Sequence, residues 1–458
     1  MEGLKINEIL FSRIYESAIL RLESEFYNSE NITYINTITG EKAILYAQYG
    51  TSAELNEKND GYPILRLNEF NSSFISVPAK YCNQIDEQIY QSLKLKKNDV
   101  LICRTNGNPH LVGKSALVPK DYEYAFASYL FRVRPNPDFI NSATLVTFLN
   151  SKYGRQEIEK YSMVSNQANF SPAKFKEIRI PLFSPRLMDE IERLTYLAFE
   201  CLENSMDTHQ AAEELLQNKI AINTTQLTAT FSNVKTIQQS YHISNRLDAE
   251  YYQPKYDEII DKISQYPYGH DKIGKLYILR DKNFVPGDNT RYKYIELSDI
   301  GINGEISGCT YEYGSNLPSR ARRIVHTGDI IISSIEGSLQ SCAIITEEYD
   351  GALCSTGFYV LSPRRINSET SLVLFKSPAI QALLKRACTG TILTAMNKDE
   401  FTTISLPIIN IDTQNKIADI VQQSTALRKE SHRLLNLAKT MVVTAIEQGE
   451  NKAIELLN

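Results

Sequence analysis

Two stretches of the sequence have the spacing of apolar residues that is typical of long amphipathic helices. In residues 185–220 and again in residues 412–448, apolar side chains recur every three to four positions, and neither stretch has an internal Gly or Pro. At about 1.5 Å per residue, each helix would be roughly 50 Å long. A helix of that length with one apolar side needs a partner, and the other stretch is the obvious one. The predicted packing residues are Leu187, Ile191, Leu194 and Leu215 in the first helix and Ile417, Ile420, Leu434, Leu437 and Met441 in the second.

The region before each predicted helix has the pattern of short β-strands. These segments are rich in β-branched and aromatic residues and are bounded by Gly, Pro, Asn and Asp. Helical stretches at 142–160 and 368–387 interrupt them. The predicted strands include residues 61–70, 99–103, 114–118, 129–134, 178–182, 329–333, 342–346 and 358–362. The pattern therefore predicts an α+β fold with two β-rich domains, each followed by a long helix.

The two halves of the chain are copies of one unit. Residues 21–27 match 246–252 at an offset of 225, residues 62–70 and 97–102 match 292–300 and 327–332 at 230, and Pro181 matches Pro407 at 226. Four matches in one order indicate a tandem duplication. The predicted boundaries are a first domain at 1–183, a helix at 184–220, a connecting loop with a short strand at 221–244, a second domain at 245–410 and a second helix at 411–450.

Composition and charge exclude some classes of protein. With 42% hydrophobic and 22% charged residues, the chain has an ordinary globular composition. It has no apolar run of the roughly 20 residues that cross a bilayer, and Glu2 and Glu8 stand where a signal peptide would be basic and then apolar, so we expect a cytoplasmic protein without a membrane partner. The scattered cysteines and histidines show no metal-ligand spacing, so no metal site is predicted. The net charge of −5 leaves nucleic-acid binding open, because phosphate contacts depend on local clusters of Lys and Arg.

Catalytic motifs fail on spacing or on composition. Residues 107–115 approach a phosphate-binding loop but have five residues between the glycines, where four are required, and a strand pattern follows, which favours a tight hairpin turn. Residues 165–170 resemble the Asn-Pro-Pro-aromatic loop of amino-methyltransferases only faintly, since both prolines are missing. We therefore predict a non-catalytic chain without a cofactor of its own.

Polar loops on the β-rich domains are the remaining candidates for a binding site. Arg, Lys, Asn, Gln, Thr, Ser and His side chains can contact base edges and phosphates, although a solvated role is the commoner one for any single loop residue. The loops differ between the copies while strands and helices are alike, as expected of two domains that recognise two sequences. The candidates are Arg104, Thr105, Asn106, Asn108, His110, Lys114, Asn166, Gln167, Asn169 and Lys174 in the first copy, and Arg291, Lys293, Arg320, Arg322, Arg323, Ser334, Ser338 and Gln340 in the second.

These features together resemble the specificity (S) subunit of type I restriction-modification systems. The resemblance rests on residues 95–104, on the Asn/Gln-rich loop 165–170 before 175–181, and on the long helix that follows, and it extends over both copies. It implies two target-recognition domains that each recognise half of a split DNA target, and two spacer helices that pack as an antiparallel coiled coil with pseudo-two-fold symmetry and act as a ruler.

The same resemblance implies the partners. Two DNA adenine methyltransferase subunits would bring S-adenosylmethionine, and restriction motor-nuclease subunits would bring ATP and Mg. In the second copy residues 389–396 replace the Asn/Gln loop, so the roles of Asn166, Gln167 and Asn169 do not transfer to it; they contact DNA, contact the methyltransferase or cap the following helix. The rival hypothesis is a protein-interaction scaffold in an anti-phage complex that has no DNA specificity.

Overall fold

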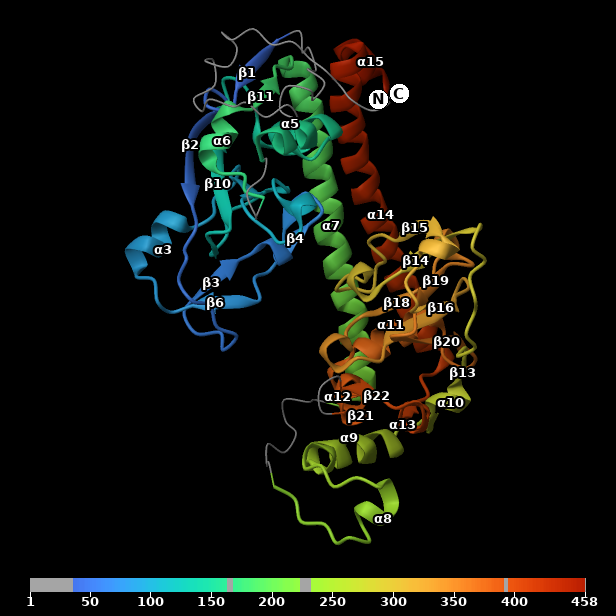
Figure 1. The fold of residues 1–458 in the computed structure, drawn as a ribbon. Helices are drawn as coiled ribbons and strands as arrows, with labels where there is room; N and C mark the ends of the chain where they lie inside the picture. Colours follow the sequence, from blue (N-terminus) through green and yellow to red (C-terminus); the bar gives the residue numbers. More distant parts are fainter. Residues whose placement is uncertain (1–35, 163–167, 223–231, 391–393, 458) are drawn as a thin grey trace. The chain divides into compact units, whose positions relative to one another are not determined.

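The computed structural model describes residues 36–162, 168–222, 232–390 and 394–457. It divides into a first unit, residues 1–202 with 429–458, and a second unit, residues 203–428. Both units combine helices with sheets, so the fold is α+β (Figure 1). The predicted boundaries of the recognition domains stay a prediction.

A six-stranded sheet forms the centre of the first unit, in the order β2-β10-β7-β8-β5-β4. Along β7, Val100 and Ile102 belong to one buried core and Leu101 and Cys103 to another, because successive side chains point to opposite faces of a sheet. Both faces of this sheet are therefore covered. Its strands are β2 (Ile44–Tyr49), β4 (Phe70–Asn71), β5 (Phe74–Ile75), β7 (Val100–Cys103), β8 (Ser115–Leu117) and β10 (Leu130–Pro135).

Smaller elements complete the first unit. A three-stranded sheet has the order β6-β3-β9, and β1 pairs with β11. The bounds are β1 (Thr37–Thr39), β3 (Tyr62–Leu65), β6 (Lys80–Cys82), β9 (Ala125–Phe126), β11 (Arg179–Pro181), α3 (Glu87–Leu93), α4 (Ser142–Leu149), α5 (Lys152–Ser162), α6 (Pro172–Glu177), and the 3-10 turns η1 (Leu67–Glu69) and η2 (Pro109–Leu111). The helical stretch predicted at 142–160 is two helices, with Asn150 at the C-terminal cap of the first. The Asn150 side chain bonds both backbone groups of Ser115.

The second unit has two four-stranded sheets, β13-β20-β17-β18 and β15-β14-β19-β16, and the pairs β12-β23 and β21-β22. The strands are β12 (His270–Lys272), β13 (Tyr277–Leu279), β14 (Arg291–Ile295), β15 (Thr310–Tyr313), β16 (Ala321–Ile324), β17 (Ile330–Ser333), β18 (Cys342–Ile344), β19 (Leu353–Ser355), β20 (Phe358–Pro363), β21 (Cys388–Thr389), β22 (Ala395–Met396) and β23 (Ser405–Pro407). The helices are α8 (Tyr241–Ser244), α9 (Pro254–Ser264), α10 (Ile273–Leu276), α11 (Ser368–Lys376), α12 (Pro378–Arg386) and α13 (Lys398–Thr403).

Two corrections concern the second unit. The stretch predicted as one helix at 368–387 is interrupted at Ser377, because Pro378 disfavours helical backbone at the residue before it. The strand predicted within 221–244 is wrong for the described part of that segment, which contains the short helix α8.

The strand registers of the two units match residue for residue. In the first unit Ile64 pairs with Ala125, and Tyr62 lies opposite Cys82. In the second unit the residues at the matching positions of the duplication pair in the same way: Tyr294 with Leu353, and Tyr292 opposite Glu312. A slip of one residue in the pairing would turn every side chain of a strand to the other face of the sheet. The matching registers therefore show that the two copies agree in strand pairing as well as in sequence.

The two predicted long helices are α7 (Pro185–Ile220) and α14 (Ile411–Gln448). In the first unit Leu187, Ile191, Leu194, Leu434 and Met441 share one core, against which Leu437 packs. In the second unit Ile417 belongs to a core against which Leu215 and Ile420 pack. Helix α14 ends two residues before the predicted 450, because Gly449 has a φ of +93° and starts a separate helix, α15 (Glu450–Glu455).

Two buried serines on these helices bond backbone carbonyls across the helix pair. In the first unit Ser431 Oγ donates to the Ala198 carbonyl at 2.7 Å. In the second unit Ser205 Oγ donates to the Ser424 carbonyl at 2.8 Å. Both the donors and the acceptors are related by the same offset of 226 in the sequence.

Candidate nucleic-acid interface

The loop that follows β7 lies beside the segment that precedes α6. The Arg104 N–H donates to the Tyr129 carbonyl, and the Arg104 carbonyl accepts from the Phe170 N–H, both at 2.8 Å. Thr105 forms a β-bridge with Asn169, whose carbonyl accepts from Lys174 Nζ at 2.8 Å. The fold thus brings together candidates from two distant parts of the sequence. Asn166 and Gln167 lie outside the described residues.

The side chain of Arg104 is held in place from two sides. Its Nη1 donates to the Ser128 carbonyl at 3.2 Å, and its guanidinium carbon lies 5.2 Å from the ring centroid of Tyr49. Tyr49, at the end of the edge strand β2, is 46% exposed. A guanidinium has five N–H donors, so this anchorage leaves several for a ligand. Sequence reasoning missed Tyr49; the available signal was an aromatic residue at the end of a strand.

The other candidates in this loop mostly shape it. Asn106 Oδ1 accepts from the Asn108 N–H at 2.8 Å, and Asn108 Oδ1 accepts from the His110 N–H at 3.0 Å. Lys114 is half-buried, and burial lowers the pKa of its amine. The loop ends at Gly113, with a φ of +79°, and strand β8 follows and pairs antiparallel with β7, so the two strands form a hairpin. The predicted tight turn is wrong, because the connection runs from Arg104 to Lys114 and contains η2. The side chain of His110 is exposed.

The second unit builds the same backbone arrangement with other side chains. The Ser334 N–H donates to the Gly357 carbonyl at 2.8 Å, and the Ser334 carbonyl accepts from the Met396 N–H at 2.7 Å. Ser334 therefore occupies the position of Arg104. Its side chain is buried, and its Oγ donates to the Gly357 carbonyl at 2.9 Å. Ser338 likewise shares a hydrogen bond with Ser333 at 2.8 Å, whereas Gln340 is exposed.

Both loops start from a strand that is anchored by a buried carboxylate. Asp99 accepts from the Lys96 N–H at 2.9 Å and forms ion pairs with Arg132 at 3.1 Å and Arg134 at 3.2 Å. Burial raises the pKa of Asp99, and the two guanidinium groups oppose that rise. Asp329, at the matching position before β17, accepts from the His326 N–H at 2.9 Å and pairs with Arg280 at 3.2 Å. These contacts fix the strand that ends in each loop.

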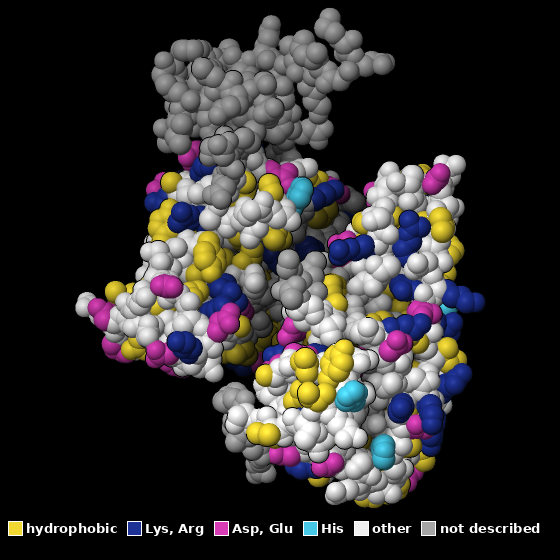
Figure 2. Space-filling model, turned by 60° about the horizontal axis from the view of Figure 1, so that its bottom comes forward, with side chains coloured by type: hydrophobic (Ala, Val, Ile, Leu, Met, Phe, Trp, Pro, Cys, Tyr) yellow, Lys and Arg dark blue, Asp and Glu magenta, His cyan; other side chains and the backbone are white. Residues whose placement is uncertain are grey.

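The basic residues predicted to cluster in the second unit lie on one sheet but at separate places. Arg291 and Lys293 are on β14, and Arg322 and Arg323 are on β16, with β19 between these strands. Arg320 is exposed just before β16, and Arg322 Nε donates to the Ser319 carbonyl at 3.0 Å. On the face drawn in Figure 2, Lys and Arg side chains form several separate groups, with Asp and Glu between them. The structure therefore does not bring the five cations to one point.

Two further features of the described residues concern membranes and metal ions. No described helix is both long and apolar enough to cross a membrane. Within the same residues, no three His, Cys, Asp or Glu side chains are placed to share a metal ion.

A duplicated α+β chain with differing loops on matching scaffolds defines a class of protein with two related domains. The sequence model of the type I restriction modification DNA specificity domain matches residues 24–187 and 281–437, which is more than half of the chain and includes parts of both copies. The chain belongs to this family.

Curated relatives cover only part of the chain. The specificity subunit of the type I restriction enzyme StySPI of Salmonella potsdam is 29% identical over 136 residues, 29% of either chain. The specificity subunit of EcoKI of Escherichia coli (strain K12) is 29% identical over 126 residues, 27% of this chain and 26% of the relative. The matched region thus spans under a third of each relative.

Solved structures match over nearly the whole chain at low identity. The S subunit of a type I restriction-modification system from M. genitalium is 13% identical, with a TM-score of 0.40, over 91% of this chain and 96% of that one. The HsdS subunit from Thermoanaerobacter tengcongensis is 14% identical, with a TM-score of 0.30, over 90% and 97%.

Proposed function

We propose that this chain is the DNA sequence-recognition and scaffold subunit of a type I restriction-modification complex and that it recognises a split target with two domains. The observation that carries the proposal is the position shared by Arg104 and Ser334. Their backbone N–H and C=O groups make the same hydrogen bonds in both units, while the side chains differ. Two half-sites of different sequence require domains with the same backbone arrangement and different side chains, because side chains distinguish the bases.

The long helices support a role as a ruler between the two domains. Apolar residues of α7 and α14 share cores within each unit. The bonds from Ser205 to Ser424 and from Ser431 to Ala198 are the pair that antiparallel helices related by a pseudo-two-fold axis would make. We infer that the helices form an antiparallel coiled coil, whose length sets the distance between the half-sites.

The chemistry would then reside in partner subunits. Two DNA adenine methyltransferase subunits would supply S-adenosylmethionine, and restriction motor-nuclease subunits would supply ATP and Mg. Such partners would also share the phosphate contacts, which suits a chain whose own net charge is −5. This chain would contribute sequence recognition and geometry rather than catalysis.

Mapping of methylated adenines in cells that carry this chain and its modification subunits tests the proposal. We expect a motif of two short defined sequences separated by an undefined spacer. A continuous motif, or no methylated motif, would overturn it. A complex that binds all DNA sequences equally would instead favour the scaffold hypothesis.

A further inference from the structure

One face of the β14–β15 hairpin carries basic and tyrosine side chains in alternation. Arg291 lies opposite Tyr313, and Lys293 lies opposite Tyr311. Directly opposite residues, and residues two apart on one strand, project from the same side of a sheet. The four side chains therefore share one surface, which we call the Arg–Tyr face.

Arg291 is the exposed cation of this face. Its guanidinium carbon lies 4.6 Å from the ring centroid of Tyr313 and 5.6 Å from that of Tyr311. Stacking on aromatic rings orients a guanidinium without using its N–H donors. Tyr311 and Tyr313 are 57% and 41% exposed, and β15 is the edge strand of its sheet. Lys293 is half-buried and donates to the Glu348 carbonyl at 2.6 Å, so its amine is already engaged.

The first unit does not reproduce this face at the matching place. Its antiparallel strand pair β3–β6 has the same register, with Tyr62 opposite Cys82, so Gly61 matches Arg291 and Asn83 matches Tyr313. Gly61 has a φ of +93°, and a Cβ there would lie 2.1 Å from the Cys82 carbonyl oxygen. An arginine at this position would therefore clash with the backbone of β6 and strain its own.

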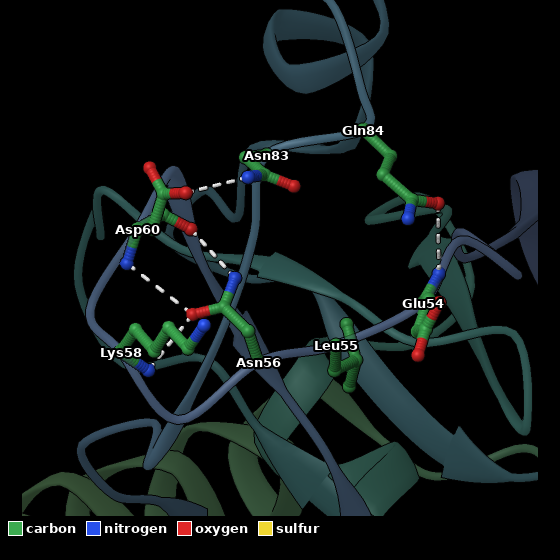
Figure 3. Close-up of a pocket in the computed structure, with 7 residues that line it drawn as sticks. All are labelled: Glu54, Leu55, Asn56, Lys58, Asp60, Asn83 and Gln84. Carbon is green, nitrogen blue, oxygen red and sulfur yellow. Dashed lines mark hydrogen bonds between the residues drawn. The ribbon is translucent and has the colours of Figure 1, made fainter.

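Acidic and amide side chains surround the matching place in the first unit. A shallow hollow of about 150 Å³ is lined there by Glu54, Asn56, Asp60 and Asn83, among others (Figure 3). Asn56 Oδ1 accepts from the Lys58 and Asp60 N–H groups at 2.9 and 3.3 Å, and Asn83 Nδ2 donates to the Asp60 carboxylate. Asn56 thus bonds mainly to backbone groups around the hollow, and one cation, Lys58, also lines it. The carboxylates of Glu54 and Asp60 would repel a phosphate.

We propose that the Arg–Tyr face contacts the phosphate backbone of DNA, and that this contact belongs to the half-site of the second unit alone. A guanidinium binds two phosphate oxygens at once, and tyrosine hydroxyls are regular donors to phosphates. The proposal rests on the proposed function. It adds that the two recognition domains contribute unequally to the salt-dependent part of DNA affinity.

The test is the salt dependence of DNA binding by the complex of this chain with its methyltransferase subunits. In Arg291→Gln, loss of one phosphate contact should reduce the slope of log K against log salt by about 0.9. The loss of affinity should be the same fold for the target and for DNA with altered half-sites. Arg433→Gln removes the same charge from an exposed arginine on α14 that pairs with Glu430, and should leave the slope unchanged. An unchanged slope in Arg291→Gln overturns the proposal.

Neutral phosphates locate the contact. Single methylphosphonate substitutions beside the second unit's half-site should weaken binding by the unmodified complex, and should add nothing to the loss in Arg291→Gln. The proposal would be contradicted if methylphosphonates beside the first unit's half-site weakened binding by the unmodified complex and added nothing to the loss in Arg291→Gln. Another contradicting result is an Arg291→Gln complex that loses a protein subunit and keeps its slope of log K against log salt. The Arg–Tyr face would then bind an acidic protein segment. If the unmodified complex shows no sequence-specific binding, the proposed function fails instead.

Discussion

Arg104 and Ser334 show how the side chain at one position of a repeated scaffold can make different contacts. Each residue is fixed through its backbone by the turn before a neighbouring strand, β10 or β20, and by the segment before a short helix. The Ser334 hydroxyl is bonded to the Gly357 carbonyl and buried, whereas the Arg104 guanidinium reaches the ring of Tyr49 near the surface. The first unit can therefore present the guanidinium N–H donors that are not bonded to Ser128, at a place where the second unit presents none from this side chain.

Replacement of Arg104 by Ala tests its contact with a base edge. If Arg104 makes a bidentate base contact, Arg104→Ala should cost about 1–3 kcal/mol of binding and relax specificity in one half-site only. Methylation rates on a set of DNAs with single base changes in each half-site measure both effects. Ser334→Ala is the matched control and should leave the target unchanged. Equal losses on every DNA would identify Arg104 as a phosphate contact.

At the scale of elements, the two units anchor their domains on the helices with different chemistry. In the first unit Phe199 of α7 packs against Phe74 at 5.3 Å between ring centroids. In the second unit an apolar core that includes Leu216 of α7 and Leu372 of α11 is joined by a polar cluster. His209 of α7, Arg428 of α14 and Lys376 of α11 are buried there, and Arg428 pairs with Glu305 at 3.4 Å. Lys376 Nζ also donates to the Gln340 carbonyl at 2.6 Å, which ties this cluster to the loop after β17.

This cluster makes the stability of the second unit depend on pH. Burial, with Arg428 and Lys376 nearby, lowers the pKa of His209 to about 4, and Glu305 opposes the shift. A second carboxylate, that of Glu213, has its Oε1 3.6 Å from His209 Nε2. The unfolded chain, with a histidine pKa of about 6.5, takes up the proton first, so the free energy of unfolding should fall as the pH drops from about 6.5 towards 4. His209→Leu should remove up to about 1.4 kcal/mol per pH unit of this slope.

Denaturant unfolding at a series of pH values measures the effect of His209→Leu. Leu435 occupies the matching position on α14, so a leucine suits this environment in the other copy of the helix. His270→Leu, at an exposed position on β12, is the control and should keep the full slope. A slope that is unchanged in His209→Leu would contradict the assignment.

At the scale of the whole molecule, the proposed ruler predicts how the target responds to helix length. Insertion of a heptad after Cys201 in α7 and another after Leu427 in α14 preserves the apolar pattern of both helices. At about 1.5 Å per residue each helix gains about 10 Å, which corresponds to about three base pairs at roughly 3.4 Å each. We expect a spacer longer by about that amount, with both half-sites unchanged.

Methylation mapping of the double-insertion variant gives the new spacer directly. Insertion into α7 alone is the control, because it shifts one helix against the other and should abolish modification. A double-insertion variant that methylates the original target would show that the helices do not set the spacing.

The sequence by itself determined the repeated features. Apolar residues every three to four positions, without Gly or Pro, suffice to predict α7 and α14, because this spacing is a local property of the sequence. The duplication was visible because both copies keep the same strand residues in the same order. Gly449 could also have marked the end of α14, since a glycine there supplies the left-handed backbone that ends a helix.

Tertiary structure decided which side chains meet and which remain available. Tyr49, Ser128 and Asn169 reach the loop of Arg104 only through strand pairing and backbone bonds between distant segments. The amide of Asn150, at the end of α4, meets its partner Ser115 across a long stretch of sequence. The basic residues predicted to form one cluster lie apart, because β19 lies between β14 and β16 in the sheet. Local pattern fixes the elements, but the use of each polar group depends on partners that only the folded chain brings near.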